Sequence, residues 1–110
     1  MTRDPDCVFC DIVAGDSPAD IVTEWLDTIA FVPLNPVTEG HVLIVPRRHV
    51  RDALDVPAVT AATMKRAAEY AEHPCNLITS AGAAATQTVF HLHIHVVPRR
   101  ADDGLALPWT

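Results

Sequence analysis

Three histidines alternate with apolar residues in the stretch F-H-L-H-I-H-V-V-P-R-R, residues 90–100. They are His91, His93 and His95. Successive side chains of a strand point to opposite faces, so the three imidazoles are expected on one face and the apolar side chains between them on the other. Imidazoles this close repel one another when charged, and their ordinary pKa lies near ~6.5. We therefore expect mostly neutral rings that share a chemical task.

Three tasks suit such a row of imidazoles: binding a metal together, holding an anion, or supplying a nucleophile with helpers. In the first case the three histidines and a water would form a catalytic zinc site. The adjacent segments contain no Asp or Glu to act as a general base or to orient the ligands, which disfavours this alternative. A half-buried histidine cluster without chemistry is a further alternative, but strict alternation of three favours function.

A second group of reactive side chains begins with the pair Cys7 and Cys10 in the pattern C-x-x-C. A structural zinc site needs four ligands. His49 follows an apolar strand and His91 opens the histidine stretch, so these two could complete a Cys2His2 site. A reduced, inert cysteine pair fits the spacing equally well. The count of 3 cysteines, without a secretion signal, disfavours a disulfide framework.

Length and charge limit the classes of protein. The 110 residues suit one domain spanning 1–110, and a hydrophobic fraction of 49% predicts a folded chain. A net charge of −6 argues against general nucleic-acid binding. No apolar run is long enough for a membrane span, and the start M-T-R-D-P-D does not resemble a signal peptide. We expect a cytoplasmic protein without nucleic-acid or membrane partners.

Two helices are expected around the reactive residues. Asp6 can cap a short helix that runs through Ala14 and stops at Gly15. Asp55 can cap the main helix, which would run through His73 before Pro74. The inner stripe of the main helix is predicted as Ala61, Met64, Ala68 and Ala71.

Five segments have the character of strands. They are residues 21–24, 28–34, 41–46, 76–80 and 90–100. The run at 41–46 is almost wholly apolar, as in a central strand covered on both faces. The predicted fold class is α+β, with about five mainly antiparallel strands, one main helix and one short N-terminal helix.

The motifs together resemble a known family. H-L-H-I-H-V-V matches the H-x-H-x-H-x-x signature of the histidine-triad (HIT) nucleotide hydrolases and transferases. C-V-F-C-D-I-V-A-G resembles the N-terminus of the zinc-bearing bacterial members. The stretch F-V-P-L-N-P-V-T-E-G-H-V-L-I-V-P-R-R-H-V and the loop A-G-A-A-A-T-Q-T-V-F are also similar to the family, whereas residues 51–74 match in type only.

The resemblance implies a mechanism. His93 would attack the α-phosphate of a nucleotide and form a covalent nucleotidyl-histidine, with His95 and His41 as helpers. Residues expected beside the phosphate or leaving group are Gln87, Thr88 and Ser80, the last at a position where relatives carry Asn or Gln. Substrates would be nucleoside phosphoramidates or dinucleoside polyphosphates, with a nucleoside monophosphate as product. The alternatives are a nucleotide-binding regulatory module that turns over slowly and the three-histidine zinc hydrolase.

The resemblance also implies ligands and partners. It supports one structural zinc per chain at Cys7, Cys10, His49 and His91, and no organic cofactor. The positions that match the base and sugar pocket are Phe9, Ile12, Phe31, Leu34 and Asn35, while Val8 and Leu43 match it but suit the core equally well. Pro33 replaces an Asp that binds the ribose hydroxyls in many relatives. A purine nucleotide substrate and a homodimer are expected, with Trp109 reaching the partner's site.

Overall fold

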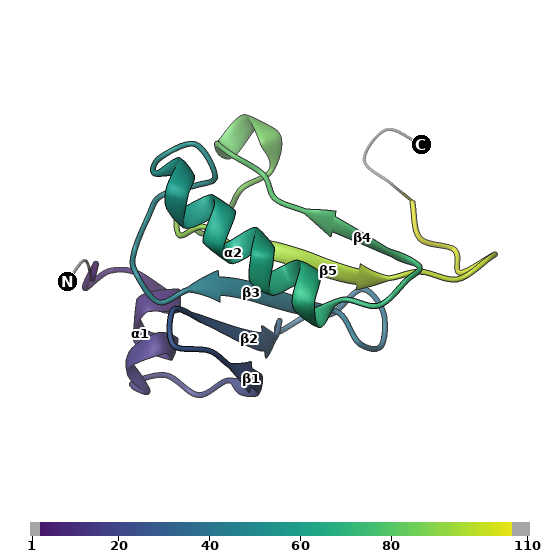
Figure 1. Ribbon diagram of the computed structural model, residues 1–110, viewed down its shortest axis with the longest axis horizontal. Coiled ribbons are helices and arrows are strands. Elements are labelled where there is room, and N and C mark those ends of the chain that lie inside the picture. Colours follow the sequence, from purple (N-terminus) through teal and green to yellow (C-terminus); the bar gives the residue numbers. More distant parts are fainter. Residues whose placement is uncertain (1–2, 107–110) are drawn as a thin grey trace.

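The centre of the protein is a five-stranded sheet in the order β1-β2-β3-β5-β4, in which every neighbouring pair is antiparallel (Figure 1). The structure is a computed structural model that describes residues 3–106. Its strands are β1 (Asp20–Glu24), β2 (Thr28–Val32), β3 (Val42–Pro46), β4 (Cys75–Ile78) and β5 (Ile94–Pro98). Its helices are α1 (Val8–Ala14), α2 (Pro57–Tyr70) and the short 3-10 turn η1 (Ala83–Ala85). The predicted α+β class is confirmed.

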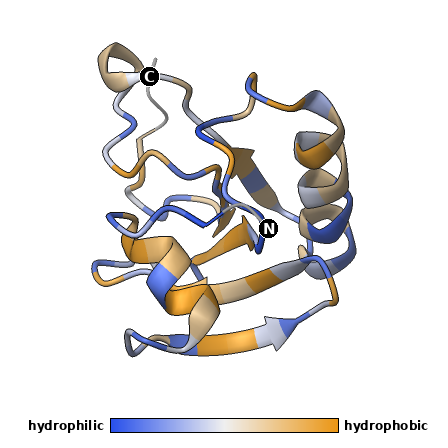
Figure 2. Cartoon of the chain, turned by 90° about the vertical axis from the view of Figure 1, so that its left-hand side faces the viewer, coloured by the Kyte–Doolittle hydropathy of each residue, from blue (hydrophilic) through white to orange (hydrophobic). Residues whose placement is uncertain are grey.

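Each face of the sheet has its own hydrophobic core, because side chains alternate along the strands. On one face α1 covers a cluster formed by Phe9, Ile12, Ile29, Phe31, Leu43 and Val45. On the other face α2 covers Ala30, Val42, Ile44, Ala67, Ile94 and Val96. Figure 2 shows hydrophobic residues along the strands, with the two helices on opposite sides. Strand β3 contributes to both clusters and is buried throughout, as predicted for a central strand.

Several predicted strand boundaries were wrong by a few residues. Strand β2 ends at Val32 rather than at Leu34, and the chain then turns through Pro33. Strand β4 is residues 75–78 instead of 76–80. Within the histidine stretch, regular pairing begins at Ile94, so His91 and His93 precede the strand and His95 lies within it.

Helix α1 is capped by Cys7 rather than by Asp6. The Sγ of Cys7 accepts a hydrogen bond from the backbone N of Cys10 at 3.4 Å. The backbone N of Asp6 instead donates to the Asp4 carboxylate at 2.9 Å. The predicted stop at Gly15 is confirmed, since this residue has φ 81 and ends the helix in the left-handed conformation. The thiol that caps the helix thus belongs to the C-x-x-C pair.

Helix α2 differs from the prediction in its cap, its end and its buried stripe. Val56 is the N-cap, and the Asp55 carboxylate accepts from the backbone N of Arg51 at 2.9 Å. The helix ends at Tyr70, not at His73. Its fully buried residues are Thr63 and Ala67, whereas the predicted Ala61 and Ala68 are exposed and Met64 and Ala71 are half-buried.

Alanines lie on several sides of α2, so the sequence does not indicate which side of this helix faces the sheet. Thr63 can be buried because its Oγ1 donates to the Val59 carbonyl oxygen at 2.8 Å. Among the residues that the structure describes, neither helix has the length and apolarity that a membrane span requires. The predicted role of Trp109 lies outside the described residues.

Candidate active site and metal centre

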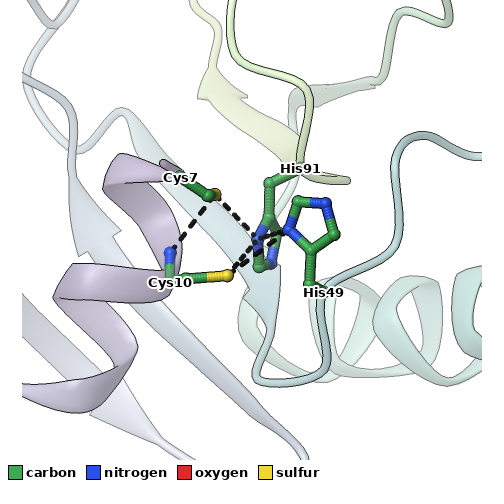
Figure 3. Close-up of side chains that lie close together, drawn as sticks. All are labelled: Cys7, Cys10, His49 and His91. Atoms are coloured by element: carbon green, nitrogen blue, oxygen red, sulfur yellow. Dashed lines mark hydrogen bonds between the residues drawn. The ribbon is translucent and has the colours of Figure 1, made fainter. Parts of the chain in front are cut away.

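Four predicted metal ligands meet at one point beside α1 (Figure 3). The ligand atoms of Cys7, Cys10, His49 and His91 all lie within 4.8 Å of one another. The shortest cross-segment distances are 3.2 Å between the two His Nδ1 atoms and 3.3 Å from Cys7 Sγ to His91 Nδ1. Two thiols and two imidazoles at such spacing form the donor set of a tetrahedral structural zinc site. The group links α1, the loop after β3 and the segment before β5.

The surroundings of His91 leave the correct nitrogen available for a metal. Its Nε2 lies 2.8 Å from the carbonyl oxygen of Pro46 and must donate to it, so Nδ1 carries the lone pair. Burial lowers the pKa of His91 to about 4, which keeps the ring neutral. Burial also raises the pKa of the Cys7 thiol to about 11. These residues therefore fit zinc by donor type, spacing and imidazole tautomer.

Asp4, which precedes α1, contacts the same group of four side chains. Its backbone N donates to Cys10 Sγ at 3.4 Å, and its carbonyl oxygen accepts from Cys7 N at 3.1 Å. One carboxylate oxygen is held by Asp6 N, while the other lies 3.9 Å from His49 Nε2. Asp4 thus touches three of the four predicted ligands, and neither motif nor spacing in the sequence indicates it.

His93 is oriented by a backbone carbonyl. Its Nδ1 lies 2.8 Å from the carbonyl oxygen of His91 and therefore donates, so in the neutral ring the lone pair is on Nε2. Burial lowers the pKa of His93, an effect partly opposed by this hydrogen bond. The Phe9 ring packs edge-on against the imidazole with centroids 5.2 Å apart. The lone pair needed for nucleophilic attack is thus available near neutral pH.

His41 and His95 form a chain of hydrogen bonds with a defined direction. The backbone N of Val37 donates to His41 Nδ1 at 3.1 Å, so the neutral ring carries its proton on Nε2. That proton points to His95 Nδ1, 3.0 Å away, which leaves His95 with a proton on Nε2. Burial lowers the pKa of His95 to about 4, and electrostatic repulsion from the His93 and His41 rings makes a smaller contribution in the same direction. Burial also lowers the pKa of His41.

An apolar pocket of about 660 Å³ opens onto these histidines. It contains all five predicted base and sugar residues, namely Phe9, Ile12, Phe31, Leu34 and Asn35. Val8, Pro33, Leu43 and Thr88 also line it. Leu34 is 99% exposed and lies at the rim, whereas Phe31 belongs to the core cluster below α1. A flat ring system with apolar faces suits a pocket of this lining.

A smaller chamber of about 310 Å³ lies on the other side of the histidines. It shares His41, His93 and His95 with the apolar pocket, and we call it the polar chamber. Its other polar lining residues are Asn76, Ser80, Thr86, Gln87 and Arg99. Of the predicted phosphate residues, Ser80 and Gln87 therefore lie here and Thr88 lies in the apolar pocket. Sequence reasoning missed Asn76, which no motif marks.

The side-chain amide of Gln87 forms three hydrogen bonds within the protein. Its Nε2 donates to the carbonyl oxygens of Arg51 and Val89 at 2.8 and 3.1 Å. Its Oε1 accepts from Gly82 N at 2.8 Å. Both amide protons are thus used to hold the loop before the histidines, and a phosphate contact by Gln87 stays a prediction.

Comparisons with known proteins agree with this geometry. Residues 14–102 match the model of the HIT domain. A Zn-bound histidine triad family protein from Mycobacterium smegmatis has a structure similar to this one, with a TM-score of 0.82 and 38% identity over 92% of this chain and 80% of that one.

Two relatives have names that describe activities. An adenosine 5'-monophosphoramidase of Saccharomyces cerevisiae is 33% identical over 98% of this chain and 72% of its own length. An adenylylsulfatase of Arabidopsis thaliana is 34% identical over 94% of this chain and 57% of its own length. With the matched domain, the shared fold and the histidine cluster taken together, the chain belongs to the HIT family.

Proposed function

We propose that this protein hydrolyses nucleotides that carry a substituent on the α-phosphate, through a covalent nucleotidyl intermediate on His93. The observation that carries the proposal is the 2.8 Å hydrogen bond from His93 Nδ1 to the His91 carbonyl, which leaves the Nε2 lone pair free. This imidazole lies where the apolar pocket meets the polar chamber. A nucleoside in the pocket would bring its α-phosphate to that junction. The names of the yeast and plant relatives support the same class of substrate.

The reaction would take two steps. In the first, His93 Nε2 attacks phosphorus, a P–N bond forms, and the bond to the substituent breaks with its electron pair going to the leaving group. His95 Nε2–H, held in place by His41, would donate to a phosphate oxygen. In the second step water attacks phosphorus, the P–N bond breaks, and the nucleoside monophosphate is released. Of the two protons of the water, one stays on the released nucleoside monophosphate, and the other replaces the proton that an amine leaving group takes up on departure or goes to solvent when the leaving group is an oxyanion.

Zinc would take no part in these two steps. When bound by Cys7, Cys10, His49 and His91, it would act as a structural cross-link that holds α1 and the His91 backbone in position. The chemistry would be carried by imidazoles and would not require an open metal coordination site.

The pocket also favours a second candidate, a nucleotide-binding module with slow turnover. Pro33 lines the pocket where many HIT relatives offer a ribose-binding carboxylate, so the sugar would be held less firmly.

A homodimer remains an expectation from the family resemblance, and sedimentation of a single species with the mass of one chain at micromolar concentration would contradict it.

The test is turnover of a fluorogenic adenosine phosphoramidate by the wild type and by His93→Ala. We expect His93→Ala to lose about three decades of kcat or more. The exposed His73 supplies the matched control, His73→Ala, which should retain wild-type activity. Brief chelation should leave the initial rate intact while the protein stays folded. Activity that survives in His93→Ala contradicts the mechanism, and nucleotide binding without turnover supports the binding module.

A further inference from the structure

The imidazole of His93 makes one hydrogen bond among the described residues, from Nδ1 to the His91 carbonyl oxygen at 2.8 Å. A bond at one ring atom fixes the position of that atom but leaves the ring free to turn about it. Such a turn would move Nε2, the nitrogen that must be directed at phosphorus for attack. A second contact is therefore needed to hold the plane of this ring.

Two other rings contact the imidazole of His93. The Phe9 ring stands perpendicular to it, with centroids 5.2 Å apart and an interplanar angle of 88°. The His95 ring also lies 5.2 Å away, at an angle of 64°. Edge-to-face pairs at these distances are favourable and prefer a defined mutual orientation. Because His95 is itself part of the hydrogen-bonded chain with His41, Phe9 is the neighbour without a polar task of its own.

Phe9 is a firm support because of its place on α1. In the sequence it lies between Cys7 and Cys10, whose thiols belong to the metal group. Its side chain is buried, and its ring also contacts the rings of Phe31 at 5.4 Å and His91 at 5.9 Å. A ring packed against several buried neighbours has little freedom to move. The contact with the nucleophile is therefore made by a fixed side chain.

Lining the apolar pocket does not by itself explain this contact. Phe31 lines the same pocket and belongs to the same core cluster as Phe9. Within the described part of the chain, its ring packs against that of Phe9 and not against that of His93. The two phenylalanines thus share the pocket and the core but differ in their contact with the nucleophile.

We propose that Phe9 is a positioning residue for the nucleophile as well as a wall of the apolar pocket. Its ring keeps the imidazole of His93 in the plane in which Nδ1 donates to the His91 carbonyl and Nε2 is available to phosphorus. The role is one of packing, since Phe9 has no polar atom with which to act on the phosphate. This inference rests on the proposed function, because it concerns the attack by Nε2.

A spectroscopic measurement tests the positioning without any turnover. Proton–nitrogen correlation NMR spectra distinguish the Nδ1–H tautomer of a neutral histidine from the Nε2–H tautomer, and loss of the signal in His93→Gln assigns it. We expect the Nδ1–H tautomer in the wild type, because the His91 carbonyl accepts from Nδ1. In Phe9→Leu we expect a mixture of both tautomers, since a ring that turns away from the carbonyl loses this preference.

Phe31→Leu is the matched control, because it makes the same change in the same pocket and cluster. It should keep the Nδ1–H tautomer of His93. Equal mixing in both variants would mean a general loosening of the core and would overturn the proposal, as would a pure Nδ1–H form in Phe9→Leu. If Phe9→Leu does not fold, Phe9→Met carries the same test, since methionine fills irregular space without a ring.

Single-turnover kinetics with saturating adenosine 5′-phosphoramidate separate the first step from binding. We expect Phe9→Leu to slow the labelling of His93 at least ~10-fold more than Phe31→Leu does, since small misplacements of reacting atoms cost large factors in rate. Calorimetry should show similar losses of AMP affinity in both variants, because both rings line the pocket.

The two measurements fail separately. Equal labelling rates in Phe9→Leu and Phe31→Leu would refute the positioning role while leaving the proposed function intact. A wild-type protein that is never labelled would instead contradict the proposed function. The tautomer comparison needs no substrate, so in that case it would still decide whether Phe9 holds the ring of His93.

Discussion

The Nδ1 of His93 lies 2.8 Å from the carbonyl oxygen of His91, the residue whose own ring belongs to the Cys2His2 group. A predicted metal ligand therefore also orients the predicted nucleophile. The His91 ring is fixed in turn by the Pro46 carbonyl, at the end of the buried strand β3. His91 thus connects the buried strand β3, the group of metal ligands and the reactive imidazole of His93.

Loss of one thiol should release zinc and loosen α1. We expect Cys10→Ser to bind less than one zinc per chain and to melt roughly 10 °C or more below the wild type, since ~1 kcal/mol shifts Tm by ~4–8 °C in a domain of this size. Elemental analysis and thermal unfolding measure the two effects. Cys75→Ser, at the half-buried start of β4, is the matched control. Equal melting temperatures for all three proteins would contradict a structural zinc.

The carboxylate beside His49 should tune metal affinity. Partners outside the ligand shell orient a ligating imidazole, and their loss typically costs ~10–100-fold in affinity. At 3.9 Å the Asp4 carboxylate is a loose partner, so we expect Asp4→Asn to weaken zinc binding about 10-fold. Competition with a chromophoric chelator gives the affinity. Asp6→Asn removes the same charge next to the site, and a loss as large as that of Asp4→Asn would show that only net charge matters.

Stability should fall in weak acid because His95 is buried as a neutral ring. Its pKa is about 4 in the folded protein and near ~6.5 in the unfolded chain, so between these values the unfolded chain binds more protons. The favourable contribution is therefore complete above about pH 6.5 and is lost as the pH falls toward 4. Urea unfolding from pH 7.5 to 4.5 measures the slope. We expect His95→Gln to flatten it, and an unchanged slope would count against a buried neutral His95.

Gln87 should matter for stability as well as for any contact with substrate. Its carboxamide makes three hydrogen bonds in a site that is 4% exposed. Gln87→Ala leaves buried backbone groups without partners, and we expect a loss of about 2–4 kcal/mol in the free energy of unfolding. Denaturant titration checks this, with the exposed neighbour Thr88→Ala as control. A change below ~0.5 kcal/mol would mean that water replaces the amide without cost.

The sheet could be predicted because it follows from strict local patterns, whereas spacing alone left the metal group open and the resemblance to the HIT family favoured it. Alternation in 90–100 indicates the face of the three imidazoles, and their rings do gather on the α1 side, where Phe9 packs against His91 and His93. C-x-x-C and two distant histidines match a known donor set, and the fold brings them within 4.8 Å.

Features that depend on long-range contacts could not be predicted. The buried stripe of α2 was predicted at the wrong residues, because alanines lie on several sides of the helix and do not indicate which side is buried. Thr63 is polar, and its burial depends on the hydrogen bond from its hydroxyl to the Val59 carbonyl oxygen. Asn76 carries no motif, and it lines the pocket beside the histidines because β4 pairs with β5.

The most direct test of the account is to trap the intermediate. Wild-type protein mixed with adenosine 5′-phosphoramidate and quenched in base within milliseconds should gain the mass of one nucleotidyl group, and peptide mapping should place it on His93. His93→Ala should gain none, while His73→Ala should be labelled like the wild type. A label on another residue, or steady turnover with no labelled protein at any quench time, would contradict covalent catalysis by His93.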